Sequence, residues 1–147
     1  MPGYRCFVAS ESLSIDISAA QERVWQVITD VESWPQWTTS MTMVKLLDDG
    51  PLRVGSRARV KQPGLPSMVW QVTDITDGTE FTWITRTAGV TATAIHSLDE
   101  TPAGVRLTLT VAWDGIFAGV VAAMAGKQTR KYLALETAGA KSRAEAA

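Results

Sequence analysis

The sequence predicts a single α+β domain in which an antiparallel sheet wraps a long C-terminal helix. Between residues 41 and 113, short runs of alternating apolar and polar side chains are separated by Gly, Pro and Asp turns, a pattern typical of a β-meander. Residues 115–136 have helical spacing instead, and their first half carries no charge. Because 147 residues is the usual length of one domain, residues 1–147 are expected to share one core.

The chain begins with a predicted strand followed by a helix. Side chains alternate between apolar and polar over residues 7–17, which is the period of a half-buried strand. The motif Ser18-Ala-Ala-Gln21 then has the form of a capping box, which starts a helix. Apolar residues at helical spacing extend this helix over residues 19–30. Pro35 is expected to stop any continuation.

Two indoles flank that proline in the short segment Trp34-Pro35-Gln36-Trp37. The first interpretation is a hydrophobic plug at one end of the core, because a tryptophan buries a large apolar area. The alternative places one of the indoles at the entrance to a ligand site. The sequence leaves both open.

Six further strands are predicted after this segment. They are expected at residues 41–47, 56–62, 68–75, 80–87, 90–98 and 105–113. Alternation assigns every second side chain of a strand to the inner face of the sheet. The inner residues expected are Ala58, Val60, Met68, Trp70, Val72, Phe81, Trp83, Thr85, Ala92, Ala94, His96, Leu98, Leu107, Leu109, Val111 and Trp113. This face is mostly apolar, and the small Ala92 and Ala94 leave space beside it.

The C-terminal helix is predicted over residues 115–136 and is expected to form one wall of a pocket. Its residues expected to meet the sheet are Phe117, Val120, Val121 and Met124. Gly119 and Gly126 disfavour a helix by about 1 kcal/mol each relative to Ala, so we expect them to allow a close approach of the sheet or a ligand. Residues 139–147 are expected to fray as a tail.

Composition excludes several classes of function. The net charge of −1 lacks the basic excess that phosphate-backbone binding requires, so no nucleic-acid partner is expected. Cys6 is the sole cysteine and His96 the sole histidine, which excludes an internal disulfide and a Cys/His metal site. No metal and no cofactor is predicted. The sequence leaves the oligomeric state open between a monomer and a homodimer.

Neither the N-terminal residues nor the apolar residues 115–126 predict membrane insertion. The N-terminal residues lack the basic and apolar regions of a secretory signal, so a cytoplasmic location is expected. Residues 115–126 are apolar but far shorter than the ~20 residues needed to cross a bilayer. They are therefore expected to form part of a core helix.

Several short stretches, in this order of elements, carry a resemblance to a known family. They are Ile17-Ser-Ala-Ala20, Trp34-Pro-Gln-Trp37, Gly50-Pro-Leu-Arg-Val-Gly55, His96, Gly104-Val-Arg106 and Tyr132-Leu-Ala-Leu-Glu136. The chain resembles the polyketide cyclase/dehydrase branch of the START/Bet v 1-like (SRPBCC) helix-grip superfamily. The resemblance implies a curved seven-stranded sheet that grips the last helix around an apolar cavity. Members bind lipids, sterols or aromatic polyketides, and some catalyse cyclisation or dehydration. They share no common catalytic signature.

His96 is the candidate for acid/base chemistry. An imidazole on an apolar inner wall can move a proton near neutral pH. The alternative is a histidine that only satisfies a neighbouring backbone or hydroxyl group. Most carboxylates are expected in turns or at outward positions. Glu136 is expected in the last turns of the C-terminal helix, and no role is assigned to it. The residues expected to bind a ligand are Trp70, Trp83, Ala94, His96, Trp113, Phe117, Val121, Met124 and Gln128.

The function expected is binding of a hydrophobic small molecule, such as a lipid, a sterol or an aromatic polyketide-like compound, in an internal cavity. One alternative is a cyclase or dehydratase that uses His96 with Gln128 or Tyr132, so the sequence leaves open whether the protein is an enzyme. A further alternative is a protein-interaction module like the toxin or co-chaperone members of the superfamily. That alternative predicts a collapsed cavity and an exposed apolar patch.

Overall fold

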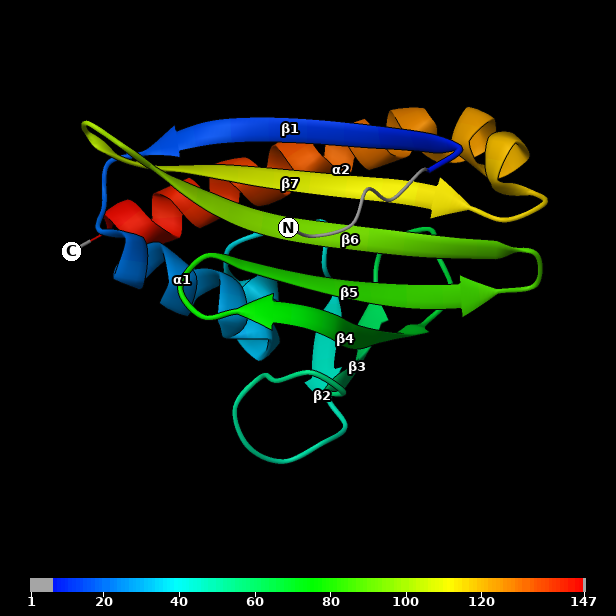
Figure 1. The fold of residues 1–147 in the computed structure, drawn as a ribbon, viewed down its shortest axis with the longest axis horizontal. Helices are drawn as coiled ribbons and strands as arrows, with labels where there is room; N and C mark the ends of the chain where they lie inside the picture. The colour runs from blue at the N-terminus through cyan, green and yellow to red at the C-terminus, as the bar shows by residue number, and fades with distance from the viewer. Residues whose placement is uncertain (1–6, 147) are drawn as a thin grey trace.

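The computed structural model describes residues 7–146, so Cys6, the N-terminal segment before it and Ala147 lie outside the described part. The elements are β1 (Ala9–Ile17), α1 (Gln21–Thr29), the 3-10 helix η1 (Val31–Gln36), β2 (Met43–Leu46), β3 (Arg57–Lys61), β4 (Met68–Thr76), β5 (Glu80–Thr87), β6 (Val90–Thr101), β7 (Gly104–Asp114) and α2 (Ala118–Glu145). The seven strands form one antiparallel sheet in the order β1-β7-β6-β5-β4-β3-β2 (Figure 1). The predicted α+β fold and its order of elements are confirmed.

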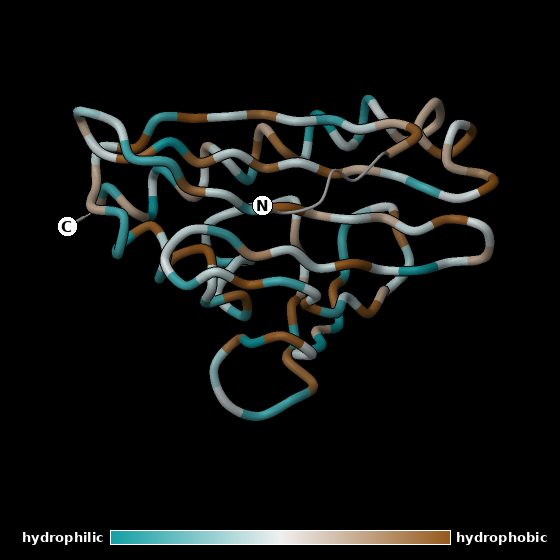
Figure 2. The backbone as a smooth tube through the Cα atoms, viewed as in Figure 1, coloured by the Kyte–Doolittle hydropathy of each residue, from teal (hydrophilic) through white to brown (hydrophobic). Residues whose placement is uncertain are grey.

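The sheet has the inner and outer faces that alternation predicted, and the change of hydropathy along its strands is visible in Figure 2. Phe81, Leu98 and Leu107 are at most 2% exposed on the inner face. The outer face is polar along β1 and β7, where Ser12 and Ser14 form hydroxyl hydrogen bonds with Thr110 and Thr108, at 3.0 and 2.7 Å. One apolar face therefore drives the sheet to pack on the helices.

Helix α1 begins differently from the prediction. Its N-cap is Ala20, and no side chain caps the helix. Gln21 instead donates from Nε2 to the Gly78 carbonyl at 2.7 Å, and the Ser18 N–H donates to the Glu145 carboxylate at 2.8 Å. The predicted capping box is therefore wrong, because tertiary partners take both groups. Pro35 lies within η1 rather than ending α1, which stops at Thr29.

Helix α2 is longer at its C-terminus than predicted. It runs to Glu145, so the expected fraying tail is wrong over residues 139–145. Ala140 and Ala144 are buried in the core at 0% and 5% exposure. The Glu145 carboxylate accepts hydrogen bonds from the Ser18 N–H and from Lys141 Nζ, which ties the last turn to the end of β1. Within residues 7–146, no helix has the length and apolar content needed to span a membrane.

Gly139 allows a close approach between α2 and Trp37, the residue that follows η1. A Cβ at this position would clash with the carbonyl oxygen of Trp37. The expected role of Gly119 is not observed, because a Cβ there would meet open space. Gly126 is buried, and a Cβ on it would lie 3.3 Å from the carboxylate of Glu11 on β1, so the expected close approach to the sheet occurs there, at a side chain. The glycine of α2 whose Cβ would meet backbone is Gly139, which the sequence pattern assigned to a tail.

This contact gives a prediction about stability. Gly139→Ala should lower the free energy of unfolding by about 1–3 kcal/mol, because the added methyl group meets backbone that cannot rotate away. Gly119→Ala is the matched control and should raise the free energy of unfolding by up to about 1 kcal/mol, because alanine favours a helix and meets no neighbour there. Urea unfolding of the two variants measures both effects. Equal effects of the two substitutions would contradict the close approach.

Candidate functional site

An interior cavity of about 290 Å³ lies between the concave face of the sheet and α2. The sheet contributes Val60, Met68, Trp70, Trp83, Thr85, Thr87, Val90, Ala92, Ala94, His96, Val111 and Trp113. Helix α2 contributes Val121, Ala125, Gln128, Thr129, Tyr132, Leu133 and Glu136. Trp34, Met41, Gln62, Leu65 and Pro66 complete the wall. Most of this surface is apolar, as is usual for small-molecule sites.

The cavity follows from the position of α2. The helix packs mainly on β1 and β7 and hardly touches β6. The inner faces of β4 and β5 are therefore left uncovered by it. Their alternation presents Trp70 and Trp83 to the space, with the small Ala94 beside them on β6.

Trp34 closes one end of this space. Its side chain is 2% exposed, and its Nε1 donates to the Ile28 carbonyl at 3.2 Å. The ring packs against Trp83, with centroids 5.3 Å apart, and against His96 at 5.5 Å. Trp34 is thus the plug of the core that one interpretation predicted, and it also lines the cavity. Trp37 lies beside it at 6.1 Å but does not reach the cavity.

Most of the predicted site residues line the cavity. Those that do are Trp70, Trp83, Ala94, His96, Trp113, Val121 and Gln128. Phe117 and Met124 do not, since they are 52% and 80% exposed, and Val120 is 60% exposed. The predicted orientation of these three side chains toward the sheet is wrong, because the first turns of α2 place small residues such as Ala118 inward.

His96 is held in a neutral state on the cavity wall. Its ring stacks on Phe81, with centroids 4.0 Å apart and an interplanar angle of 9°. Nδ1 lies 3.2 Å from the Phe81 carbonyl oxygen, which can only accept, so Nδ1 carries the proton. Burial lowers the pKa of His96 to about 4, against a smaller raising effect of this hydrogen bond. At neutral pH, Nε2 therefore carries a lone pair and the ring carries no charge.

Glu136 is the functional candidate that the sequence analysis missed. Its carboxylate accepts a hydrogen bond from Ser40 Oγ at 2.9 Å. Burial raises the pKa of Glu136 to about 7, although the bond from Ser40 acts in the opposite direction. Glu136 and His96 also share a second, small cavity of about 10 Å³ with Trp34 and Leu109. A carboxylic acid and a neutral imidazole therefore border the same apolar space.

A helical spacing could have pointed to Glu136. Gln128, Tyr132 and Glu136 follow one another at intervals of four, so they share one face of α2. Gln128 Nε2 donates to the Tyr132 hydroxyl at 3.2 Å, and that hydroxyl donates to the Pro63 carbonyl. These bonds fasten the loop between β3 and β4 to the helix and close one side of the cavity.

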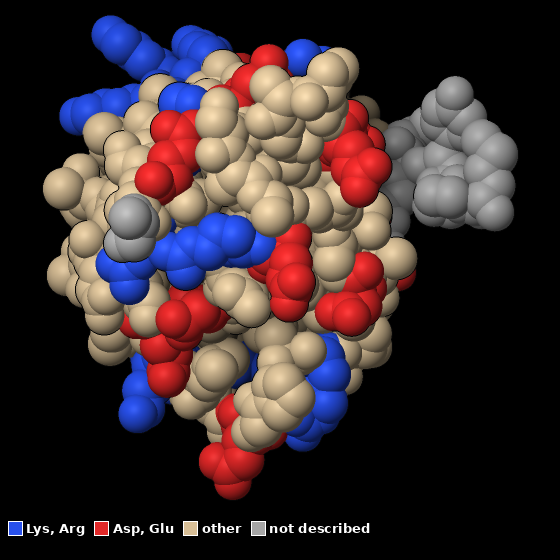
Figure 3. Space-filling model, turned by 90° about the vertical axis from the view of Figure 1, so that its left-hand side faces the viewer, with Lys and Arg blue, Asp and Glu red and all other residues tan. Residues whose placement is uncertain are grey.

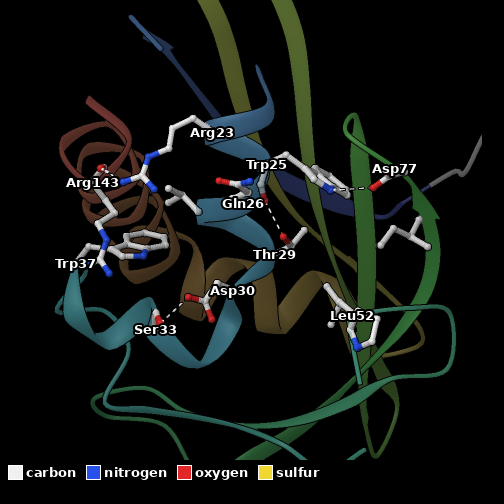
Figure 4. A pocket seen from close by; sticks show the side chains of 13 residues that line it. Arg23, Trp25, Gln26, Thr29, Asp30, Ser33, Trp37, Leu52, Asp77 and Arg143 are labelled. Carbon is white, nitrogen blue, oxygen red and sulfur yellow. Dashed lines mark hydrogen bonds between the residues drawn. The ribbon is translucent and has the colours of Figure 1, made fainter. Parts of the chain in front are cut away.

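A larger hollow of about 550 Å³ lies on the surface beside α1 (Figure 4). Several of its polar groups are bonded to the protein itself: Arg23 donates to the Arg143 carbonyl at 3.0 Å, and Ser33 donates to Asp30 at 2.7 Å. Trp25 likewise donates from Nε1 to Asp77 at 3.1 Å. Figure 3 shows acidic and basic side chains interspersed at the end of the molecule near α1. The cavity between the sheet and α2 is the better candidate, because its walls are mostly apolar and two of its groups, His96 and Glu136, have perturbed pKa values.

The donor set for a metal ion is absent from the described residues: among residues 7–146, no three His, Cys, Asp or Glu side chains cluster closely enough to hold one. The polar groups on the cavity wall that can exchange protons or hydrogen bonds with a bound molecule include the imidazole, the carboxylic acid and the Gln128 and Tyr132 side chains.

Comparison with known proteins identifies relatives. A family model described as "Polyketide cyclase / dehydrase and lipid transport" matches residues 9–145. No curated protein sequence is similar enough to count as a relative. Similar solved structures include the Zhui aromatase/cyclase from Streptomyces sp. R1128, with 15% identity, a TM-score of 0.74 and coverage of 93% of each chain. The protein TTHA0849 from Thermus thermophilus has 15% identity and a TM-score of 0.74, covering 92% of this chain and 97% of its own. The KanY protein has 17% identity and the same TM-score, covering 94% and 98%.

The opposite pKa shifts predict opposite effects of pH on stability. Burial raises the folded-state pKa of Glu136 from 4.5 to about 7, so the stability that its protonated form contributes is fully present below pH 4.5 and is lost as pH rises through 7. Burial lowers the pKa of His96 from 6.5 to about 4, so its contribution is present above pH 6.5 and is lost as pH falls through 4.

As pH rises from about 5 to about 8, the free energy of unfolding of Glu136→Gln should therefore increase by about 2 kcal/mol relative to that of the native protein. This is less than the full pKa shift would give, because the carboxylate keeps some accessible surface. For His96→Gln, the free energy of unfolding should instead increase relative to that of the native protein as pH falls. Urea unfolding across this pH range measures both differences. Differences that do not vary with pH would show that neither group is desolvated in the folded protein.

Proposed function

Because the chain belongs to the polyketide cyclase / dehydrase and lipid transport family, we propose that it holds a compact apolar molecule in the cavity between the sheet and α2. The observation that carries the proposal is the cavity itself, which has about 290 Å³ of space and walls of Trp70, Trp83, Trp113 and aliphatic side chains. Solid packing is the norm for protein interiors, so a mostly apolar hollow of this size between sheet and helix supports a site for an apolar ligand.

The size of the cavity limits the ligand. Ligand pockets in proteins range from ~300 to ~1,000 Å³, and this one lies at the lower limit. It therefore favours a compound with one to three rings over a lipid with two chains. His96, Glu136 and Gln128 are the polar groups that would orient such a compound by hydrogen bonds.

The protonation states of the site suit an uncharged ligand. Below pH 7, Glu136 is mostly protonated and His96 is neutral down to about pH 4. An apolar molecule can then enter without leaving an unpaired charge buried beside it. Above pH 7 the Glu136 carboxylate ionises and the same site becomes less favourable for apolar compounds.

Filling the cavity provides the direct test. Ala94 lines the space and is 9% exposed, so Ala94→Leu should occupy it and weaken binding of the neutral probe N-phenyl-1-naphthylamine by about tenfold or more. Ala134→Leu, on the exposed side of α2, is the matched control and should bind as the native protein does. Quenching of tryptophan fluorescence by the probe measures the affinity. Equal binding by the native protein and Ala94→Leu would overturn the proposal.

Catalysis in the cavity is a second candidate function, and Glu136 is the observation that favours it. A carboxylic acid with a pKa of about 7 can both give and accept a proton near neutral pH. His96 is the weaker base, because its pKa of about 4 leaves little driving force for taking up a proton. The proposed division of roles is that Glu136 moves the proton and His96 orients a hydroxyl or enol group.

Hydrogen–deuterium exchange tests this candidate without a known substrate. The bicyclic ketone 2-tetralone is small, apolar and enolisable, so the protein should accelerate exchange at its C1 position. Glu136→Gln should lower the acceleration by about 10²-fold or more, the usual contribution of general acid–base catalysis, whereas His96→Gln should lower it less. NMR in deuterated buffer follows the exchange. If the native protein gives only the buffer rate, a proton-transfer function for this ketone class is wrong.

The protein-interaction alternative required a collapsed cavity together with an exposed apolar patch. The cavity of about 290 Å³ disfavours that alternative. The exposed apolar patch is nevertheless present on α2, so it needs a separate explanation.

A further inference from the structure

Four large apolar side chains are exposed where β7 leads into α2. Ile116 is 84% exposed, Phe117 52%, Val120 60% and Met124 80%, and we refer to them as the α2 apolar patch. In Figure 1 this part of α2 projects at the right-hand end of the molecule, and Figure 2 shows apolar residues there. The segment is held in place, because the Phe117 N–H donates to the Gly89 carbonyl at 3.1 Å.

Packing explains these side chains only in part: Phe117 and Ile116 lie against Gly89 of the turn between β5 and β6, yet each keeps more than half of its surface exposed. Ala118 is the residue of this turn that enters the core, and it is fully buried against Val90 and Trp113. Ile116 and Met124 keep most of their surface in water, where a polar residue would serve the helix as well. The combined exposed area of the four residues of the α2 apolar patch is on the order of 500 Å², near the upper end for the largest apolar patch of a typical monomer. Such patches are often functional.

The charges next to the patch indicate what it meets. Lys127 and Lys131 continue the face that carries Val120 and Met124, since they follow at helical intervals of three and four. Both lysines are exposed, and within residues 7–146 neither takes part in an ion pair. Asp114 lies at the start of the segment, where its carboxylate accepts the Gly115 N–H at 2.9 Å. The face is thus apolar first and then cationic.

The patch lies beside one end of the cavity. Val121 and Ala125, on the other side of the same helical turns, line the cavity. Val90 and Trp113, which pack on Ala118, line it as well. A small displacement of these first turns would therefore connect the cavity with whatever covers the patch.

We propose that the α2 apolar patch docks the protein on an anionic lipid bilayer, with Lys127 and Lys131 at the headgroups, and that the apolar ligand passes between bilayer and cavity at this point. The passage of a ligand rests on the proposed function, which supplies the apolar molecule in the cavity. Apolar side chains next to unpaired lysines are the features that hold a peripheral helix in an anionic interface. A second copy of the chain is the less suitable occupant, because a stable interface buries about 800 Å² per partner and lacks unpaired lysines at its centre.

Sedimentation with vesicles tests the docking. The native protein should bind vesicles of mixed phosphatidylcholine and phosphatidylglycerol more strongly than vesicles of phosphatidylcholine alone. Ile116→Glu and Met124→Glu should each weaken binding to the mixed vesicles by about tenfold or more. Lys127→Glu and Lys131→Glu should each weaken it by at least about fivefold, and only on the mixed vesicles. Val54→Glu is the matched control, because Val54 is 59% exposed outside the patch, and it should bind as the native protein does.

Two further measurements separate the possible outcomes. Binding of N-phenyl-1-naphthylamine in solution should be unchanged in all of these variants, so loss of vesicle binding alone supports docking at the patch. Native protein that fails to bind mixed vesicles while still binding the probe would overturn the docking and leave the proposed function intact. Sedimentation velocity that finds a dimer, dissociated by Met124→Glu but not by Val54→Glu, would also overturn it in favour of a second copy.

Discussion

The position of α2 across the sheet is the constraint on which the rest of the structure depends. Gly139 lets the C-terminal half of the helix approach the Trp37 backbone closely, and Glu145 fastens the last turn to the chain after β1. At the other end, the Phe117 N–H is bonded to the turn between β5 and β6. Held at both ends over β1 and β7, the helix cannot cover β4 and β5, and the uncovered inner face becomes the wall of a cavity.

The two ionisable groups of that cavity differ in how the fold stabilises them. His96 has an aromatic ring stacked on it and a carbonyl that fixes its tautomer, so burial selects the neutral imidazole. Glu136 has a hydroxyl donor, and burial selects its protonated form over most of the acidic range. Between about pH 4 and pH 7, His96 and Glu136 are therefore both polar and mostly uncharged. Hydrogen bonding can orient a bound molecule in this range without a cost for burying charge.

The sheet was more predictable than α2, for a physical reason. A strand places every second side chain on one face, so alternation alone assigned Trp70, Trp83, Ala94 and His96 to the inner wall. Helix α2 buries mainly small residues, including Gly126, Ala140 and Ala144, whose hydropathy gives little signal. Large residues such as Met124 were therefore placed inward by the pattern, although the structure places them outward. Glu136 was missed because its pKa depends on burial by elements distant in the sequence.

The two halves of α2 face opposite requirements. The C-terminal half is tightly packed, with small residues against α1, Trp37 and the sheet, as a stable core needs. The first half has small residues inward beside the cavity and large apolar residues outward in water. A cavity has fewer packing contacts than a solid core, and exposed apolar groups are not buried, so neither feature increases the free energy of unfolding. Both features occur in the same turns, so the proposed docking of these turns on a bilayer, with ligand exchange beside them, would account for both.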